Sequence, residues 1–379
     1  MNKLCLNERR ESFQMKKEII NARQLFAMIL LFEMGTALVV PIGLESGHAV
    51  WVSILMALPG GMLLFMIYTN LYLQFPKMII SEYTRKILGK YIGWPLSLLY
   101  LSPLLFNGSR NLREAGNLLI SAAYDRTPLF IINALMIIAV MYILIKGIEV
   151  FARTAQIYLI VMFIMGVISS IVVIAAGLVD FKNLFPLHPR DWIDALKSAY
   201  PNILIFPFGE VVCFTTILPH LNKSHVARNT GVVAILVSGI ILSFIHALEI
   251  SVLGEGIYSR AVFPLFTTIT LVNLANFIQR LDAFVILTLI ICVFFKMTVY
   301  CFAAAAIAAD LFKIKDPRTL SIPIGVVVLF SSFLSAENYP IHMEEGMIFL
   351  KYFLPYLCAV IPVLLFIVHH VRKRLGLYR

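Results

Sequence analysis

Long apolar runs alternate with short polar connections along nearly the whole chain. A helix needs roughly 20 apolar residues to cross a hydrocarbon core of ~30 Å. Ten runs of about this length are predicted near 24–44, 50–72, 94–122, 128–148, 153–178, 201–219, 229–250, 281–310, 320–336 and 346–369. Proline, glycine or charged residues punctuate nearly every gap. The pattern predicts an all-α polytopic membrane protein of ten transmembrane helices, with one transmembrane domain over 24–370 between tails at 1–23 and 371–379.

Two connections carry more structure than a simple loop. In "FPKMIISEYTRKILGKYIG", apolar positions 79, 80, 83, 87 and 88 oppose charged positions 82, 85 and 86, which predicts a helix lying on the membrane surface. The segment 259–279 is apolar but contains Pro264, Asn273 and Asn276. We interpret it as a re-entrant or outer-surface helix, with an eleventh span as the alternative.

Composition and charge exclude a soluble domain and set the topology. Hydrophobic residues make up 60% and charged residues 14% of the 379 residues. The net charge of +10 does not indicate nucleic-acid binding, because all but three of the 31 Lys and Arg residues lie in the connections, 21 on one side and 7 on the other. The positive-inside rule then places both termini in the cytoplasm. Met1 and Met15 are both possible starts.

Two of the predicted spans are interrupted near their middle. The run 201–219 contains "FPFGE" at 206–210, and the run 24–44 contains Glu33, Gly35, Thr36 and Pro41. Each carboxylate lies about 9 residues, or roughly 13 Å, into its span, near the bilayer centre. The two runs open two five-span halves, 24–178 and 201–370, that cross the membrane in opposite directions, so an inverted repeat is predicted.

An interrupted helix has backbone groups that lipid cannot satisfy, so the pair of interruptions predicts a polar cavity at the midplane. For either interruption alone, a packing kink is the alternative. Exposed amides attract a carboxylate and exposed carbonyls attract an ammonium group, so an amino acid is the expected ligand.

Several ionisable residues lie inside the spans and need partners. Lys296 is expected to pair with Glu33 or Glu210. Glu210 either contacts a ligand amine or satisfies freed backbone amides. Arg110 and Glu114 have i, i+4 spacing on one face with Arg113, which favours an internal ion pair over a ligand role.

Signals for other chemistry are weak. His246 and Glu249 are interpreted as a satisfied polar pair. The five cysteines have no CxxC spacing, so neither a disulfide framework nor a metal site is indicated, and no cofactor motif is found. Without a nucleophile, base and oxyanion set, an enzyme is the least favoured class.

From about Lys17 to Arg374 the chain resembles the B subunits of spore germinant receptors of Bacillus-type bacteria, relatives of the amino acid/polyamine/organocation transporters. The resemblance rests on "ARQLF…LLFEMGTALVV", "SEYTRKILGKYIGWPLSLLY", "KGIEVFART", "FPFGEVV", "ILPHLNK", "FIQRLDAFV", "FFKMTVY" and "HMEEGM". It implies a LeuT-like fold that binds a nutrient and signals to A and C partner subunits in the inner membrane of the dormant spore.

The resemblance also implies roles for individual residues. Amides of the unwound part of span 1 would meet a carboxylate, and carbonyls of the unwound part of span 6 would meet an amine. Tyr100 is expected to close the site or to pack in the core. Lys296 would stand where a sodium-coupled relative places an ion, holding spans 1 and 8 together. The unwound residues are Gly35, Thr36 and Ala37 in span 1 and Phe206, Pro207, Phe208 and Gly209 in span 6.

Three functions compete on this sequence. The leading hypothesis is a receptor subunit whose cavity captures a small nutrient and biases a conformational equilibrium. The second is a proton- or ion-coupled amino acid permease in which Glu33, Glu210 or Lys296 titrates. The third is an assembly scaffold with an idle cavity.

Overall fold

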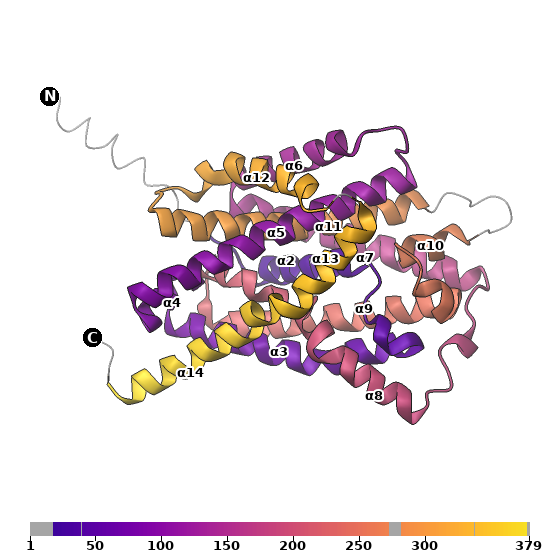
Figure 1. Cartoon of the computed structure of the whole chain (residues 1–379), viewed down its shortest axis with the longest axis horizontal. Coiled ribbons are helices and arrows are strands. Elements are labelled where there is room, and N and C mark those ends of the chain that lie inside the picture. Colours follow the sequence, from indigo (N-terminus) through magenta and orange to yellow (C-terminus); the bar gives the residue numbers. More distant parts are fainter. Residues whose placement is uncertain (1–17, 39, 273–281, 337, 377–379) are drawn as a thin grey trace.

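The computed structural model describes residues 18–38, 40–272, 282–336 and 338–376. Within these ranges the chain is helical, and a single bridge between Ile20 and Leu221 is the only β pairing. Most helices run along one axis of the molecule, and α13 and α14 cross them obliquely (Figure 1).

Short breaks separate the helices, and the bounds follow the predicted runs closely for the regular spans. The α-helices are α2 Ala22–Met34, α3 Val50–Gln74, α4 Ile80–Leu88, α5 Lys90–Ala122, α6 Leu129–Lys146, α7 Ile148–Ala175, α8 Pro189–Ser198, α9 Ala227–Tyr258, α10 Pro264–Thr270, α11 Asp282–Phe312, α12 Ser321–Leu334, α13 Tyr339–Tyr352 and α14 Ile361–Arg374.

Seven helical segments of the described chain are long and apolar enough to cross a membrane. They are Leu44–Gln74, Leu129–Lys146, Ile148–Ala175, Ser224–Tyr258, Ala283–Phe312, Pro317–Leu334 and Tyr339–Arg374. The predicted spans missing from this set are 24–44, 94–122 and 201–219. The first and third contain irregular backbone, and the second, within α5, carries Arg110, Arg113 and Glu114. These exceptions lie together around the candidate site.

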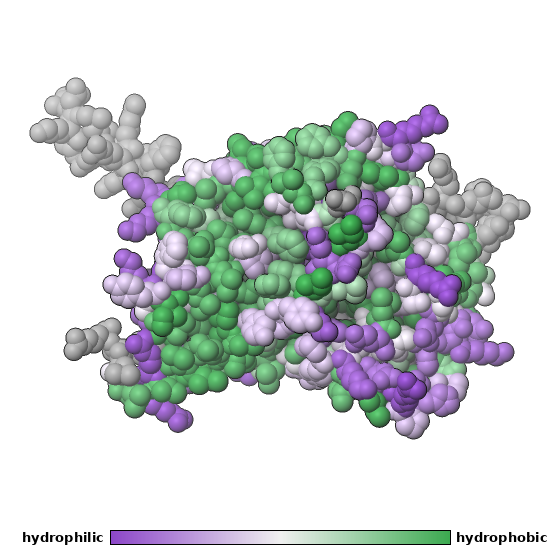
Figure 2. Space-filling model, in the orientation of Figure 1, coloured by the Kyte–Doolittle hydropathy of each residue, from purple (hydrophilic) through white to green (hydrophobic). Residues whose placement is uncertain are grey.

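The helices differ in how much of their surface is accessible to lipid. In α7 only 17% of the membrane-spanning window is buried, whereas in α11 the figure is 78%. Exposed apolar side chains on α7, among them Ile160 and Phe163, contribute to the apolar surface. Figure 2 shows apolar residues across the middle of the molecule and most hydrophilic residues toward two opposite ends. The chain is therefore an integral membrane protein with α11 at its centre.

Both ends of the described chain lie on one face of the bundle (Figure 1). The Ile20 amide donates to the His220 carbonyl at 2.9 Å, and the Glu18 carboxylate accepts from the Ile148 amide at 3.0 Å and pairs with Arg318. These contacts join the segment before α2 to three other connections on that face.

The predicted surface helix corresponds to α4, which packs on the bundle. Its apolar side is buried through Ile80, Tyr83 and Ile87, and Arg85 pairs with Asp310 of α11 at 2.5 Å. Glu82 caps the helix by accepting from the Ile79 amide at 3.0 Å. Partial burial is the main cause that raises the pKa of the Glu82 carboxyl above its ordinary value.

Other connections differ in detail from the prediction. The loop before run 201–219 contains α8, a helix that the apolar pattern did not reveal because it is short and amphipathic. Run 346–369 corresponds to α13 and α14 joined by the π turn η9, Tyr356–Val360. Within 259–279 the structure has the short helix α10, and positions 273–279 lie outside the described residues.

Candidate functional site

Regular α-helix gives way to other backbone geometry at two places in the predicted broken spans. Helix α2 ends at Met34, and Gly35 follows with φ −13° and ψ −120°, before the 3-10 turn η1, Thr36–Leu38. On the other segment, the π turn η4, Ala199–Ile203, leads to the 3-10 helix η5, Phe208–Thr216. Glycine tolerates unusual backbone angles and proline lacks an N–H, which explains why the sequence departs from α-helix here.

Lys296 of α11 reaches both irregular segments. Its ammonium lies 2.7 Å from Glu210 Oε2 in a buried ion pair that is not aligned as a hydrogen bond. The same ammonium stands 4.4 Å from the centre of the Phe206 ring and 5.3 Å from that of Phe32. A Cβ at Gly35 would lie 2.4 Å from Lys296 Cδ, so glycine is required there for the lysine to pass.

The structure distinguishes the two carboxylates considered as partners of Lys296. Glu210 makes the ion pair, and Asn107 Nδ2 also donates to its Oε1 at 3.5 Å. Glu33 has no exposed surface, and within the described chain neither of its oxygens has a hydrogen-bond partner. The α2 carboxylate is therefore buried beside the site without joining the ion pair.

A cavity of about 520 Å³ lies between the segment after α2, the middle of α5, the segment 198–210 and α13. We call it the central cavity. Its lining is mixed, with apolar side chains from α13 on one side and polar groups converging from α5 on the other. Its polar and aromatic lining residues include Thr36, Asn107, Arg110, Asn111, Glu114, Asn202, Phe206 and Glu210.

Charged residues of α5 close one end of this cavity against α13. Arg110 donates to the His342 carbonyl at 2.5 Å and to Glu114 Oε1 at 3.2 Å. The His342 imidazole lies 3.4 Å from the same Glu114 oxygen. Gly346 leaves room for the guanidinium, since a Cβ there would lie 2.2 Å from Arg110 Nη2. Arg113 turns away from the cavity and donates to carbonyls around the end of α12.

The other residues predicted to bind ligand lie around the cavity without lining it. The Gly35 amide donates to Leu31, the Ala37 carbonyl contacts His246, and the Gly209 carbonyl accepts from Tyr68 at 3.3 Å. Their backbone groups are therefore engaged within the chain. The remaining three behave likewise: the Pro207 carbonyl accepts from the Glu210 amide, Phe208 is fully buried, and Tyr100 donates to the Leu357 carbonyl at 3.0 Å.

Asn107 and Asn111 line the cavity but were not among the predicted site residues. A signal for them was present, because positions 107, 110, 111 and 114 recur at i, i+3, i+4 and i+7 and so share one face of α5. The sequence analysis considered only the charged residues on this face of α5 and not its two asparagines.

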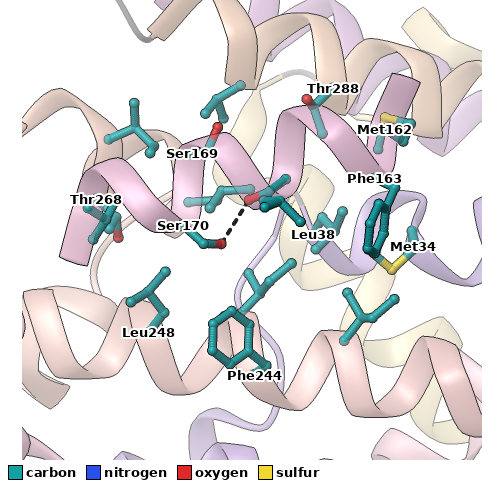
Figure 3. Close-up of a pocket in the computed structure, with 18 of the residues that line it drawn as sticks. Met34, Leu38, Met162, Phe163, Ser169, Ser170, Phe244, Leu248, Thr268 and Thr288 are labelled. Atoms are coloured by element: carbon teal, nitrogen blue, oxygen red, sulfur yellow. Dashed lines mark hydrogen bonds between the residues drawn. The ribbon is translucent and has the colours of Figure 1, made fainter. Parts of the chain in front are cut away.

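A second cavity, of about 400 Å³, is almost wholly apolar and lies away from this chemistry. Figure 3 shows it between α7 and α9, with Phe163 and Phe244 at its edge and Met34 and Leu38 from the α2 segment behind. Ser170 donates to the Gly166 carbonyl at 2.8 Å, so its hydroxyl is satisfied within α7. The apolar lining offers nothing to orient a polar solute.

No group of three or more His, Cys, Asp or Glu side chains in the described ranges is placed to hold a metal. The polar groups of the central cavity are amides, hydroxyls and the ion-paired Arg110, Glu114 and Glu210, with Glu45 and Lys351 also in its lining. Such a set suits reversible binding of a small polar molecule.

Comparison with known proteins identifies relatives over most of the chain. The sequence profile of the family described as "Spore germination protein" matches residues 19–340. Spore germination protein KB of Bacillus subtilis (strain 168) is 36% identical over 95% of this chain and 97% of its own length. Spore germination protein A2 of the same organism is 24% identical, over 86% of this chain and 87% of its own.

Two solved structures share the architecture. MhsT in complex with L-phenylalanine superposes with a TM-score of 0.60 at 13% identity, over 93% of this chain and 99% of that one. Mhp1, a nucleobase-cation-symport-1 family transporter in a closed conformation with bromovinylhydantoin bound, has a TM-score of 0.60 at 16% identity, over 87% and 75%. The chain therefore has the LeuT-like fold that these two structures share.

Proposed function

Because the chain belongs to the spore germination protein family, we propose that it is the nutrient-sensing membrane subunit of a spore germinant receptor. A small germinant binds in the central cavity and shifts the conformational equilibrium that the A and C partner subunits detect. The observation that carries this proposal is the cavity itself, which adjoins a buried ion pair between α11 and the second irregular segment, and the lysine of that pair also packs against Gly35 of the first.

In this proposal the fold has ten spans in a 5+5 inverted repeat, with spans 1 and 6 broken around Gly35 and Pro207. Both termini are cytoplasmic, on the core side of the spore inner membrane. The excess of Lys and Arg in the connections on the terminal face supports the orientation. The irregular backbone beside a polar cavity supports the assignment of the two breaks.

An amino acid is the germinant that we propose. The volume of about 520 Å³ is in the range typical of small-molecule sites. A zwitterion would lie with its ammonium toward Glu210 and its carboxylate toward Arg110, while Thr36, Asn107 and Asn111 offer hydrogen bonds between them. Glu210 is already paired with Lys296, and Arg110 with Glu114. A ligand of zero net charge therefore adds no uncompensated charge to the buried site.

A thermal-shift screen tests the proposal. The purified full-length protein is heated with amino acids, sugars and nucleosides, and a ligand of the cavity raises its melting temperature by mass action. The variant Asn107→Leu should lose that shift, because it removes a cavity amide. The matched control Asn117→Leu, ten residues along α5 and outside the cavity, should keep it. A ligand shift that survives Asn107→Leu unchanged would locate binding elsewhere.

The alternative is a proton- or ion-coupled amino acid permease, which the likeness to two transporters favours. Vesicles containing this chain alone separate the two. Concentrative uptake of a ligand found in the screen would establish the permease, whereas binding without uptake supports the receptor subunit. In either case we propose binding without catalysis.

A further inference from the structure

Three titratable side chains of α9 form a cluster on the far side of the segment that lines the central cavity. His246 and Glu249 are each 1% exposed and Tyr258 is 2% exposed. None of them lines the cavity. The proposed germinant site therefore makes no use of this buried cluster.

A sharp bend at Gly254 brings the cluster together. In a straight helix the 12 residues between His246 and Tyr258 would separate them by about 18 Å along the axis. The Tyr258 hydroxyl instead lies 3.0 Å from His246 Nδ1. Gly254 has φ 65° and ψ 164°, a conformation open almost exclusively to glycine, so the last turn of α9 folds back onto the imidazole.

The cluster binds the backbone of the cavity-lining segment at two points. His246 Nε2 lies 3.1 Å from the Ala37 carbonyl. The Tyr258 hydroxyl donates to the Ile42 carbonyl at 3.2 Å and accepts from the Ile42 amide at 3.3 Å. Ile42 and the nearby Thr36 line the central cavity. The state of the cluster therefore acts directly on one wall of that cavity.

The contacts fix where protons must be. The Ala37 carbonyl only accepts, so His246 Nε2 carries a hydrogen. Glu249 Oε2 lies 2.9 Å from His246 Nδ1, but neither Glu249 oxygen makes an aligned hydrogen bond in the described chain, whereas the Tyr258 hydroxyl is aligned with Nδ1. The pair must hold one further proton, because without it a neutral imidazole would face a buried, uncompensated carboxylate. With that proton the pair has zero net charge.

That same proton decides what the Tyr258 hydroxyl does. When Nδ1 carries it, the hydroxyl oxygen accepts from Nδ1 and its hydrogen goes to the Ile42 carbonyl. When Nδ1 has lost it, the hydroxyl is the one donor in contact with Nδ1, and it leaves the Ile42 carbonyl without its hydrogen bond. Proton loss therefore loosens the cavity wall and leaves the buried Glu249 carboxylate uncompensated in one step.

Among the described residues, the charged or titratable side chains in contact with His246 are Glu249 and Tyr258, both of α9. The elements packed against α9 carry other charged or titratable side chains. Where these side chains make polar contacts, their partners are residues other than His246; His48, for example, lies 3.6 Å from Glu255. The groups on these elements are Arg23 and Glu33 on α2, Tyr68 and Tyr72 on α3, Glu45 and His48 on the 3-10 helix η2, Leu44–Ala49, Asp180 and Lys182 at the turn η3, Phe181–Asn183, and His225 on the turn η7, Ser224–Val226.

We propose that His246 and Glu249 form a proton-binding site that controls the wall of the central cavity. In its protonated state the site carries one proton on His246 Nδ1, beside the Glu249 carboxylate. Release transfers that proton to water, takes the pair from zero to −1, and frees the backbone at Ile42. The site is independent of the germinant and of whether the chain senses or transports.

Hydrogen exchange of the full-length protein in lipid nanodiscs, between pH 6 and 9, tests this site without any germinant. The readout is deuterium uptake of peptides covering residues 36–43, corrected for the intrinsic pH dependence of exchange. The folded state holds the proton, so the opening constant of this segment should rise with pH, by up to about tenfold per pH unit for one linked proton. A flat corrected profile in the unmodified protein overturns the proposal.

Three variants separate the proton site from mere packing. Glu249→Gln should abolish the pH dependence, because a neutral glutamine amide cannot compensate the charge of a proton on His246 Nδ1. Glu255→Gln, which removes an exposed carboxylate of the same helix, should keep it. Tyr258→Phe should raise uptake at pH 6 to about the level of the unmodified protein at pH 9, since Ile42 then lacks its partner at every pH.

The variants can also refute the site. If Glu249→Gln retains the slope of the unmodified protein, or if Glu255→Gln abolishes it equally, Glu249 is not part of the proton-binding site. Should Glu249→Gln fail to fold, His246→Gln serves in its place, because the glutamine amide can still donate to the Ala37 carbonyl while removing the Nδ1 proton.

Discussion

The ion pair between Lys296 and Glu210 can be tested by removing each charge singly and both together. Lys296→Met keeps most of the side-chain volume but leaves Glu210 buried and unpaired. Glu210→Gln leaves the ammonium unpaired. The double variant removes both charges, so the site then holds no uncompensated ion.

The magnitude follows from the geometry. Two unit charges 2.7 Å apart attract one another by about 6 kcal/mol at an effective dielectric constant of ~20. Burial removes most of that gain through desolvation, yet losing one partner of a buried pair typically costs about 3–5 kcal/mol. Each single variant should therefore lower the free energy of unfolding by about that amount. The double variant should be less destabilised than the sum of the singles by about 2–3 kcal/mol.

Reversible unfolding in mixed micelles, followed by the loss of helical circular dichroism as a denaturing detergent is added, measures these differences. Lys351→Met is the matched control, because Lys351 is an exposed lysine at the rim of the same cavity. Its removal should change the free energy of unfolding by less than about 0.5 kcal/mol.

Two results would refute this reasoning. If Lys296→Met is no more destabilising than Lys351→Met, the charge at Glu210 is solvated or neutralised and the ion pair does not contribute to the free energy of unfolding. If the two single effects add in the double variant, Lys296 and Glu210 act independently and the 2.7 Å contact has no energetic consequence.

Three further predictions concern glycine and pH. Gly35→Ala should destabilise the protein by about 1–3 kcal/mol in the same unfolding assay, because its Cβ would overlap Lys296, whereas Gly166→Ala, with no atom within 4 Å, should be neutral or slightly stabilising. Gly147→Ala should also cost about 1–3 kcal/mol, since φ is 90° there, and a cost no larger than that of Gly166→Ala would contradict the strain argument. Glu82→Gln should raise the melting temperature at pH 8 more than at pH 4: the pKa of Glu82 is raised in the folded state, so its ionisation destabilises the fold as pH rises through that value, and an equal effect at both pH values would exclude this.

Much of the architecture follows from the sequence alone. Hydropathy located the regular spans to within a few residues, as α3, predicted at 50–72 and found at Val50–Gln74, illustrates. Lipid cannot satisfy backbone groups, so each long apolar run must be helical whatever its neighbours are. The same logic singled out Gly35, which directly follows the end of α2, and the segment around Pro207.

The sequence did not determine which charged and polar side chains contact one another inside the bundle. The sequence left Lys296 with two candidate carboxylates, and the structure pairs it with Glu210 while Glu33 stays without a hydrogen-bond partner. Asn107 and Asn111 became cavity residues only once the rotation of α5 about its axis was known. The contact of Tyr258 with His246 depends on one bend at Gly254.

The division has a physical reason. Transfer of a side chain from water to lipid is a property of each residue, so class, span positions and the presence of buried charges could be predicted from the chain alone. Which charge meets which depends on the rotation, tilt and depth of helices relative to one another. Those are set by packing between residues such as Gly35 and Lys296, far apart in sequence, and only the tertiary structure decides them.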